Sequence, residues 1–300
     1  MKDPAPALSS ASTTIIRGFS DPNRAGENGP AGTWPSMIVV DESADLLFRW
    51  DADSGRIRWA RPLSTKCRSL QLIDGGRVLA VNDYGFLEID ADTGAQRRTV
   101  VLASSGNVIS AYRSEAGTTL VAGMGLAGEP GIAFVEYASD LRRVRAVTFP
   151  GDYVRRTQPT PEGTFLFPAN DRVCEGDWSG RILREFSAPG FRHAWKAVRL
   201  FGGTTLIAAG YGAFVAEFAP DGRVLRRWSV ERDATLVRPN FFGDFTLLPD
   251  GRLVVCNWLG HDRGLGGSGY PFLEFGPDGA LDRGWQDAAA TSSPQTFVFV

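Results

Sequence analysis

Residues 46–59 of the chain read LLFRWDADSGRIRW, and five variants of this stretch follow. They begin at residues 86, 134, 173, 214 and 272, as FLEIDADTGAQRR, FVEYASDLRRVR, VCEGDWSGRILREF, FVAEFAPDGRVLRRW and FLEFGPDGALDRGW. Each contains a strand-like run, a tight turn with Asp and usually Gly, and a second strand-like run. Glycine supplies the positive φ that such turns require. The six copies therefore predict an all-β chain built from a repeated hairpin.

The turn glycines set the period of this repeat. Gly55 and Gly94 are 39 residues apart, and Gly180 and Gly222 are 42 residues apart. Leu141 stands where a glycine would fall between Gly94 and Gly180. Repeats of about 40–45 residues with four strands each are typical of propeller blades. The period therefore predicts one β-propeller rather than two ordinary domains.

The two ends of the chain complete the expected ring. The first repeat supplies only three strands (SMIVVDE, LLFRWD and RIRWARP), whereas the last six residues, QTFVFV, form a strand without a repeat. Placing that strand innermost in blade one closes the ring and leaves no exposed sheet edge. We therefore expect a six-bladed β-propeller with four-stranded antiparallel blades over residues 36–300. Residues 1–35, rich in Pro, Ser and Gly, form an N-terminal arm in this interpretation, and its TTIIRGF segment could add an edge strand.

The turn and the strand after it resemble a known repeat. DADSGRIRW (51–59) has an Asp-x-x-Ser-Gly turn before an outer strand that ends in Trp, and PDGRVLRRW (220–228) and PDGALDRGW (277–285) keep the Gly and the Trp. This pattern resembles the repeat of the pyrroloquinoline-quinone-like propellers. The resemblance implies repeat architecture only. Quinone-binding members resemble larger rings with vicinal cysteines, which this chain does not have, so we expect no cofactor.

The composition limits the function classes. Hydrophobic content of 43% and charged content of 22% are those of a soluble globular protein. A net charge of −2 argues against a nucleic-acid partner. No apolar run approaches the roughly 18 residues of a membrane span, and the first residues lack a signal-peptide core. We therefore expect a cytoplasmic protein with no membrane partner.

A glycine-rich stretch near the end of the chain matches the G-x-G-x-x-G spacing. It lies in NWLGHDRGLGGSGYP (257–271), which also contains His261. A dinucleotide loop needs a helix after it, yet here the strand-like FLEF follows. We interpret the stretch as a long crossing between the second and third strands of blade six. Long loops are often functional. A second interpretation is therefore that this stretch and the similar insertion GMGLAGEPG (123–131) form a lid or rim over the channel mouth.

The segments that lead into the six inner strands are unusually basic. They would surround the channel at one opening, where converging Arg and Lys side chains attract anions. We therefore expect a basic funnel that binds an anionic small molecule. The ligand-binding candidates are Lys66, Arg68, Asn107, Arg155, Arg156, Trp195, Asn240, Phe242, Trp258 and Gln295. In the alternative interpretation, half of the basic groups point elsewhere or pair with carboxylates of the blades.

The catalytic candidates are the two histidines, His193 and His261, with Tyr211 to assist. Histidine is the usual acid–base group near neutral pH. If the protein is an enzyme, we expect lyase, isomerase or hydrolase chemistry without a cofactor. Two alternatives stay open: a protein–protein interaction propeller without catalysis, and a metal-dependent, lactonase-like hydrolase. We assign no metal ligand, because the inner-strand starts offer few carboxylates.

Overall fold

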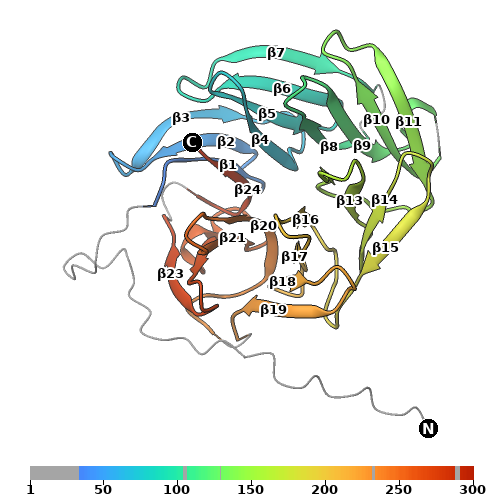
Figure 1. The fold of residues 1–300 in the computed structure, drawn as a ribbon. Helices are drawn as coiled ribbons and strands as arrows, with labels where there is room; N and C mark the ends of the chain where they lie inside the picture. Colours follow the sequence, from blue (N-terminus) through green and yellow to red (C-terminus); the bar gives the residue numbers. More distant parts are fainter. Residues whose placement is uncertain (1–33, 104–106, 129, 232–233, 288–290) are drawn as a thin grey trace.

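The computed structural model describes residues 34–103, 107–128, 130–231, 234–287 and 291–300. Six four-stranded sheets stand around a common axis (Figure 1). Every pairing within these sheets is antiparallel, so the predicted six-bladed β-propeller is confirmed. Residues 1–33, which include the TTIIRGF segment, lie outside the described residues.

The sheets follow the chain in order, and we number the blades accordingly. From the innermost to the outermost strand, blade one holds β24 (Pro294–Phe299), β1 (Met37–Asp41), β2 (Leu46–Asp51) and β3 (Arg56–Pro62). Blade two holds β4 (Ser69–Ile73), β5 (Arg77–Asn82), β6 (Gly85–Asp90) and β7 (Gln96–Val101). Blade three holds β8 (Val108–Arg113), β9 (Thr119–Met124), β10 (Ile132–Tyr137) and β11 (Arg143–Phe149).

The second half of the ring has the same order. Blade four holds β12 (Gln158–Pro159), β13 (Phe165–Pro168), β14 (Val173–Gly176) and β15 (Ile182–Phe186). Blade five holds β16 (Lys196–Arg199), β17 (Thr205–Ala208), β18 (Phe214–Phe218) and β19 (Val224–Ser229). Blade six holds β20 (Phe241–Leu247), β21 (Leu253–Trp258), β22 (Phe272–Phe275) and β23 (Leu281–Trp285).

The C-terminal strand closes the ring as predicted. β24 pairs antiparallel with β1, with Phe297 opposite Val39 and Val298 opposite Ile38. The C-terminus therefore lies inside blade one (Figure 1). The first and last segments of the propeller share one sheet, which ties the ring shut by backbone hydrogen bonds.

The repeated turn has the backbone conformation expected of it. Gly55 and Gly94 have φ of 64° and 70°, and Leu141, which replaces the glycine in blade three, has φ of 68°. Gly94 also lies against the Trp59 ring of blade one, where a Cβ atom would come within 2.6 Å of the indole. Trp59 Nε1 donates to Ala91 O at 3.0 Å. The outer-strand Trp therefore docks onto the turn of the next blade.

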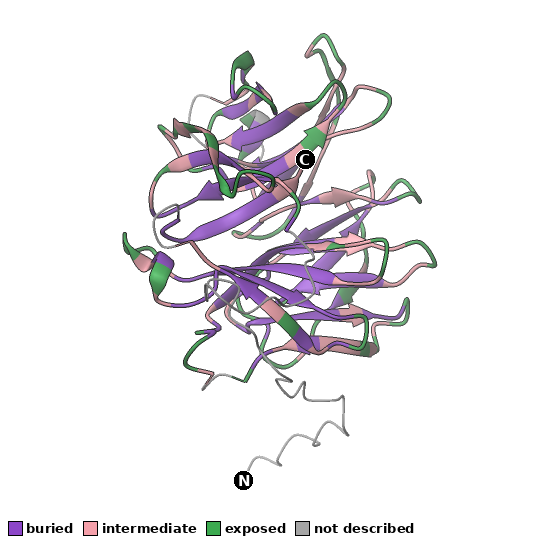
Figure 2. Ribbon diagram, turned by 90° about the vertical axis from the view of Figure 1, so that its left-hand side faces the viewer, coloured by how far each residue is buried: buried purple, intermediate pink, exposed green. Residues whose placement is uncertain are grey.

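The core lies between successive blades, and the second and third strands of each blade are the most buried (Figure 2). Phe134 of blade three stacks on Phe165 of blade four, with ring centroids 4.4 Å apart. Buried carboxylates on third strands add ion pairs between blades: Arg113 of β8 donates to Glu88 of β6 at 3.0 Å. Apolar packing and these pairs together hold neighbouring blades in register.

The only helical elements in the described ranges are two three-residue 3₁₀ turns, η1 (Leu126–Gly128) and η2 (Leu265–Gly267). η1 lies in the β9–β10 connection and η2 in the β21–β22 connection, the two insertions noted in the sequence. No helix in this part of the chain is long and apolar enough to cross a membrane.

Candidate functional site

The inner strands give the channel a direction. Within β4, Leu70 is fully buried and Leu72 is 45% exposed, and within β20, Phe245 is 2% and Leu247 is 37% exposed. We call the side where the inner strands begin the start face, and the side where they end the end face. The channel is therefore closed to solvent near the middle of the inner strands and open to solvent at the end face.

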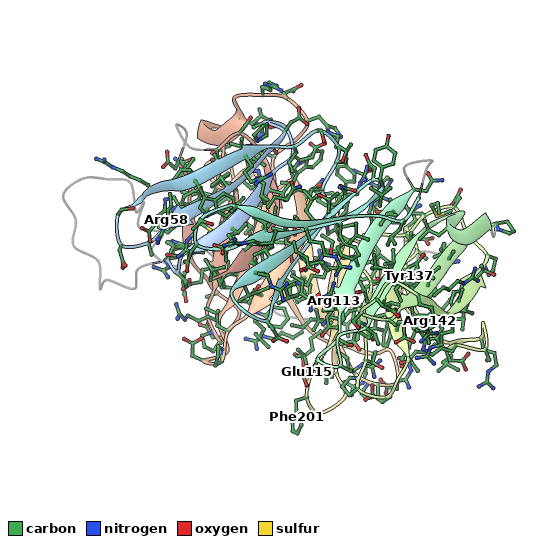
Figure 3. All side chains as sticks on the ribbon, turned by 90° about the horizontal axis from the view of Figure 1, so that it is seen from above. Arg58, Arg113, Glu115, Tyr137, Arg142 and Phe201 are labelled. Atoms are coloured by element: carbon green, nitrogen blue, oxygen red, sulfur yellow. The ribbon has the colours of Figure 1, made fainter. Side chains whose placement is uncertain are left out.

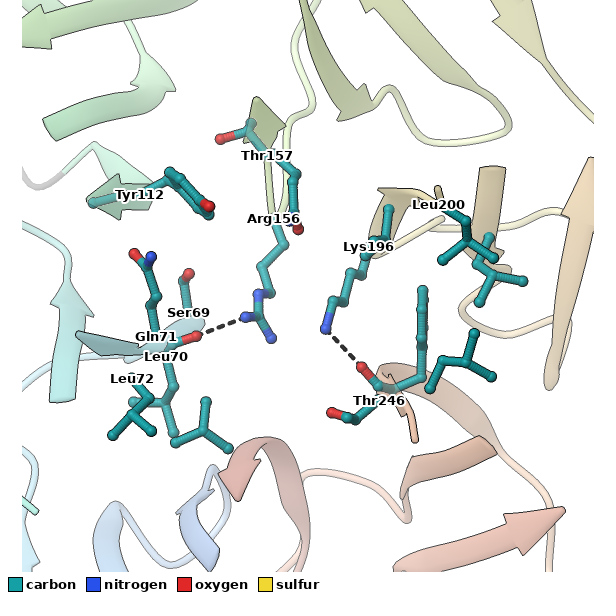
Figure 4. Close-up of a pocket in the computed structure, with 17 residues that line it drawn as sticks. Ser69, Leu70, Gln71, Leu72, Tyr112, Arg156, Thr157, Lys196, Leu200 and Thr246 are labelled. Carbon is teal, nitrogen blue, oxygen red and sulfur yellow. Dashed lines mark hydrogen bonds between the residues drawn. The ribbon is translucent and has the colours of Figure 1, made fainter. Parts of the chain in front are cut away.

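A cavity of about 350 Å³ occupies the end-face half of the channel (Figure 4). Its volume is at the lower end of the range for small-molecule sites. Side chains from inner strands around the ring line it, with polar groups such as Gln71 and Tyr112 and apolar groups such as Leu200 and Val298. The sequence had predicted a site at the start face, so the location of this cavity differs from that expectation.

Arg156, in the segment that leads into β12, crosses the channel at the inner end of this cavity. Its Nη1 donates to Asp244 Oδ2 in blade six and to Thr296 Oγ1 in blade one, the latter at 3.2 Å. Its Nη2 donates to Leu70 O in blade two at 2.6 Å (Figure 4). One side chain from blade four therefore binds three other blades.

Lys196 of β16 approaches the same carboxylate from blade five. Its Nζ lies 2.8 Å from Asp244 Oδ1 and 2.6 Å from Phe245 O. Burial lowers the pKa of Lys196 to about 8, against the opposing effect of Asp244. Burial would raise the pKa of Asp244, but the charges of Arg156 and Lys196 outweigh it and hold that pKa below its usual value. Lys196 and Asp244 therefore face each other mainly as an ion pair at neutral pH.

The charges at the inner end of the cavity do not balance. Two cations, Arg156 and Lys196, share the single carboxylate of Asp244. An arginine has five N–H donors and a lysine three. The hydrogen bonds with described residues engage three donors of Arg156 and two of Lys196. Asp244 also accepts hydrogen bonds from the Thr296 hydroxyl and the Phe245 amide. N–H donors of Arg156 and Lys196, and one positive charge, are therefore left over for an anion.

Two of the basic side chains that the sequence placed in a funnel at the start face are paired with carboxylates. Lys66 Nζ pairs with Glu42 Oε1 at 2.7 Å, and Arg68 Nη1 pairs with Asp83 Oδ1 at 2.7 Å. These are pairs with blade carboxylates, which was the alternative interpretation. This pairing weakens the field of these two cations, whereas burial and then the charges of Arg155 and Arg192 still lower the pKa of the nearby His193.

Aromatic side chains of blades five and six form a cluster on the start face. Trp195, Phe241 and Trp258 are 5%, 3% and 3% exposed, and pack with Tyr211 in one cluster. The Arg155 guanidinium lies over the Tyr153 ring at 4.0 Å. It also lies 5.3 Å from the Trp195 ring, so it packs on this cluster, and it does not line the end-face cavity.

Four other ligand-binding candidates do not line the end-face cavity. Phe242 is fully buried in the core between blades five and six, next to a register shift in β20. Gln295 is 7% exposed. Asn240 Nδ2 donates to Trp258 O at 3.0 Å, and the half-buried Asn107 accepts from the Met124 amide through its backbone carbonyl.

The catalytic candidates lie together on the start face, away from the cavity. The His193 ring is 5.5 Å from that of Tyr211, and the Trp258 ring is 4.5 Å from that of His261. Burial, and then the charges of Arg155 and Arg192, lower the pKa of His193. His261 Nδ1 lies 3.1 Å from Glu42 Oε2.

The glycine-rich stretch links blade six to blade one. Arg263 pairs with Asp45 at 3.1 Å, the Gly264 amide donates to Ser292 Oγ at 2.7 Å, and Gly266 lies against Thr291 O, where a Cβ atom would come within 1.9 Å. β22 follows without an α-helix. The prediction of a crossing between the second and third strands is confirmed.

Lys196 and Asp244 lie in the segments that lead into the inner strands, but neither was among the ligand-binding candidates chosen from the sequence. A signal was present, because Asp244 interrupts the apolar run FFGDFTLL and Lys196 follows Trp195 at the start of a buried strand. This pattern predicts that the two charged side chains are buried, but it does not predict that they pair with each other. Elsewhere in the described ranges, no three His, Cys, Asp or Glu side chains gather in a way that could hold a metal ion.

Comparisons with known proteins agree on the architecture. A family model described as outer membrane protein assembly factor BamB matches residues 12–135, less than half of the chain. With the six four-stranded blades, this match shows the pyrroloquinoline-quinone-like repeat architecture that the sequence predicted. No curated protein matches the chain.

Solved structures share the fold at low identity. A Bacteroides caccae protein of unknown function has a TM-score of 0.74 and 22% identity, covering 88% of this chain and 98% of that one. A streptogramin B lyase has a TM-score of 0.58 and 11% identity, covering 85% and 82%. An inactive His-to-Ala variant of Staphylococcus aureus virginiamycin B lyase with quinupristin has a TM-score of 0.55 and 13% identity, and the match covers 83% of each chain. These similarities show the fold alone.

Proposed function

We propose that the protein binds a small organic monoanion in the end-face cavity. The carboxylate of the ligand binds Arg156 and Lys196, and its apolar part extends towards Leu72 and Leu247 at the mouth. The observation that carries this proposal is the excess of one positive charge over Asp244 at the inner end of the cavity. An anion there restores neutrality in a place where an unbalanced charge is costly.

The lining of the cavity supports an amphiphilic ligand. Polar groups gather around the two cations at the inner end, whereas Leu72, Leu200 and Leu247 line the cavity towards the end face. Arginine binds carboxylates with directed hydrogen bonds, and apolar walls bind a short hydrocarbon chain. Figure 3 shows Phe201, which is fully exposed, projecting beyond the ribbon on the side where Glu115 also lies.

Calorimetric titration tests this proposal. Hexanoate should bind the full chain, whereas hexanol, which has the same chain length without the charge, and acetate, which has the charge without the chain, should bind much more weakly. Arg156→Gln should abolish hexanoate binding. Arg68→Gln is the matched control, because Arg68 was the start-face candidate and is paired with Asp83. Loss of binding in the control alone would place the site on the start face, and hexanoate that fails to bind the wild type would end the proposal.

A second candidate function is acid–base catalysis on the start face. The ring of His193 lies 5.2 Å from that of Tyr153 and 5.5 Å from that of Tyr211. Its lowered pKa keeps the imidazole neutral at pH 7 and able to accept a proton. The structural similarity to the S. aureus lyase, whose His-to-Ala variant is inactive, suggests quinupristin as a probe. Conversion by the wild type and by His261→Ala, but not by His193→Ala, would support this candidate; an unchanged probe would exclude it.

A further inference from the structure

The primary amine of Lys196 lies beside a guanidinium at the inner end of the cavity. Lys196 Nζ binds one oxygen of the Asp244 carboxylate, and Arg156 Nη1 binds the other. Both side chains line the cavity and point towards its centre (Figure 4). A ligand carboxylate that binds Arg156 would therefore bring its neighbouring carbon atom towards Lys196.

Lysine is a rare residue in this protein. The chain has 32 Lys and Arg residues, of which only Lys2, Lys66 and Lys196 are lysines. Lys2 lies outside the described residues, and Lys66 is exposed on the start face. Arg113 and Arg199, whose side chains are 16% and 5% exposed, pair with the buried carboxylates of Glu88 and Glu175. A lysine differs from arginine in that its amine can lose a proton and become a nucleophile.

We propose that Lys196 forms an imine with the carbonyl carbon of a 2-oxo carboxylic acid whose carboxylate binds Arg156. This inference rests on the proposed function, because it assigns a substrate class to the same cavity. In a 2-oxo acid the carboxylate and the carbonyl carbon are directly bonded. Arg156 and Lys196 lie close enough to bind the two oxygens of one carboxylate, that of Asp244, so they are close enough to reach these two neighbouring groups of the ligand.

The reaction balances without an oxidant or reductant. The ammonium of Lys196 loses a proton to solvent, and the nitrogen lone pair of the neutral amine attacks the carbonyl carbon. The carbonyl oxygen takes up two protons, one from the attacking nitrogen and one from solvent, and leaves as water while the C–N double bond forms. The product is an iminium ion, so the positive charge beside Asp244 is preserved in this buried site.

Two features of the surroundings favour this step. With a pKa of about 8, roughly a tenth of the Lys196 amine is neutral at pH 7, on the order of a hundredfold more than for an ordinary lysine. Arg156 forms an ion pair with Asp244, and Tyr112 lines the cavity. Burial raises the pKa of Tyr112, so its hydroxyl stays protonated and can donate a hydrogen bond.

Reductive trapping tests the inference. The full chain is incubated with 2-oxohexanoate and sodium cyanoborohydride, and the modified lysine is identified by mass spectrometry. We expect one adduct per chain, on Lys196, with labelling at least about tenfold above that of Lys66. The adduct should disappear in Lys196→Arg, which keeps the charge, and persist in Lys66→Arg, the matched control. Excess hexanoate should suppress it by competition.

The outcomes separate the two proposals. If hexanoate binds the wild type but 2-oxohexanoate leaves no adduct on Lys196, the imine is excluded and the anion site stands. If Lys66 is labelled as strongly as Lys196, the reaction is ordinary surface chemistry and the inference is wrong. If neither compound binds, both proposals fail. Hexanoate binding to Lys196→Arg shows that the variant keeps a folded cavity, and circular dichroism checks the fold independently.

Discussion

Lys196 Nζ lies 2.8 Å from Asp244 Oδ1, although 48 residues separate them in the chain and they belong to different blades. Arg156, from a third blade, binds the other oxygen of that carboxylate. The fully buried Asp244 thus joins blades four, five and six across the channel. This junction separates the aromatic cluster on the start face from the end-face cavity.

Asp244→Asn should strongly destabilise the protein. The substitution removes the one carboxylate between Arg156 and Lys196 and leaves two buried cations facing each other. Removal of one partner from a buried ion pair costs about 3–5 kcal/mol. Urea unfolding of the variant measures this loss.

The matched control for that variant is Asp83→Asn. Asp83 pairs with Arg68 on the start face, where both side chains are about a quarter exposed. Such a partly exposed pair contributes about 1 kcal/mol or less. Equal losses of unfolding free energy in the two variants would mean that the channel network adds no more than a surface pair.

The stability of the wild type relative to Lys196→Arg should rise with pH above 8. The pKa of Lys196 is about 8 in the folded protein, because of burial, and about 10.4 in an unfolded chain. Between these values the unfolded state holds more protons, so the free energy of unfolding increases with pH. Arginine stays protonated in both states, so the variant lacks this contribution.

Denaturant unfolding of both proteins at pH 7.5 and at pH 10 measures this effect. The difference should shift in favour of the wild type by about 1–3 kcal/mol. Other groups that titrate in this window are common to both proteins and cancel. A flat or falling difference would show that the amine keeps an ordinary pKa next to Asp244.

Glu88→Gln should cost more stability than Glu217→Gln, although both residues occupy equivalent places in the repeat. Glu88 is 2% exposed and binds Arg77 at 2.6 Å and Arg113 at 3.0 Å. Glu217 is half-buried and accepts from the Thr204 hydroxyl, with no ion pair among the described residues. We expect a loss of about 3 kcal/mol for Glu88→Gln and less than about 1 kcal/mol for Glu217→Gln. Thermal melts of both variants give the comparison.

Deletion of residues 295–300 should prevent the ring from closing. It removes most of β24 and leaves β1 with an unpaired edge in blade one. We expect aggregation, visible by size-exclusion chromatography. Deletion of Val300 alone removes one hydrogen bond, from its amide to Ser36 O, and should leave a monodisperse folded protein. A well-behaved chain without residues 295–300 would contradict closure by the last strand.

The sequence by itself determined the architecture of this protein. The repeated turns, the period of about 40 residues and the orphan strand QTFVFV depend on local backbone preferences and on strand alternation, which are readable within each repeat. Leu141 is an example. Its position in the period predicted a turn without glycine, and in the structure Leu141 has a positive φ, 68°, as the glycines have in the other turns.

Only the tertiary structure decided where the charges balance. Arg68 and Arg156 both precede inner strands, yet Arg68 meets Asp83 within its own blade and Arg156 crosses the channel to Asp244. The physical reason is that these contacts depend on the twist of the blades and on the bulge in β20, which set side-chain directions over distances that no local pattern records. The cavity therefore lies at the end of the channel opposite to the one that the basic segments indicated.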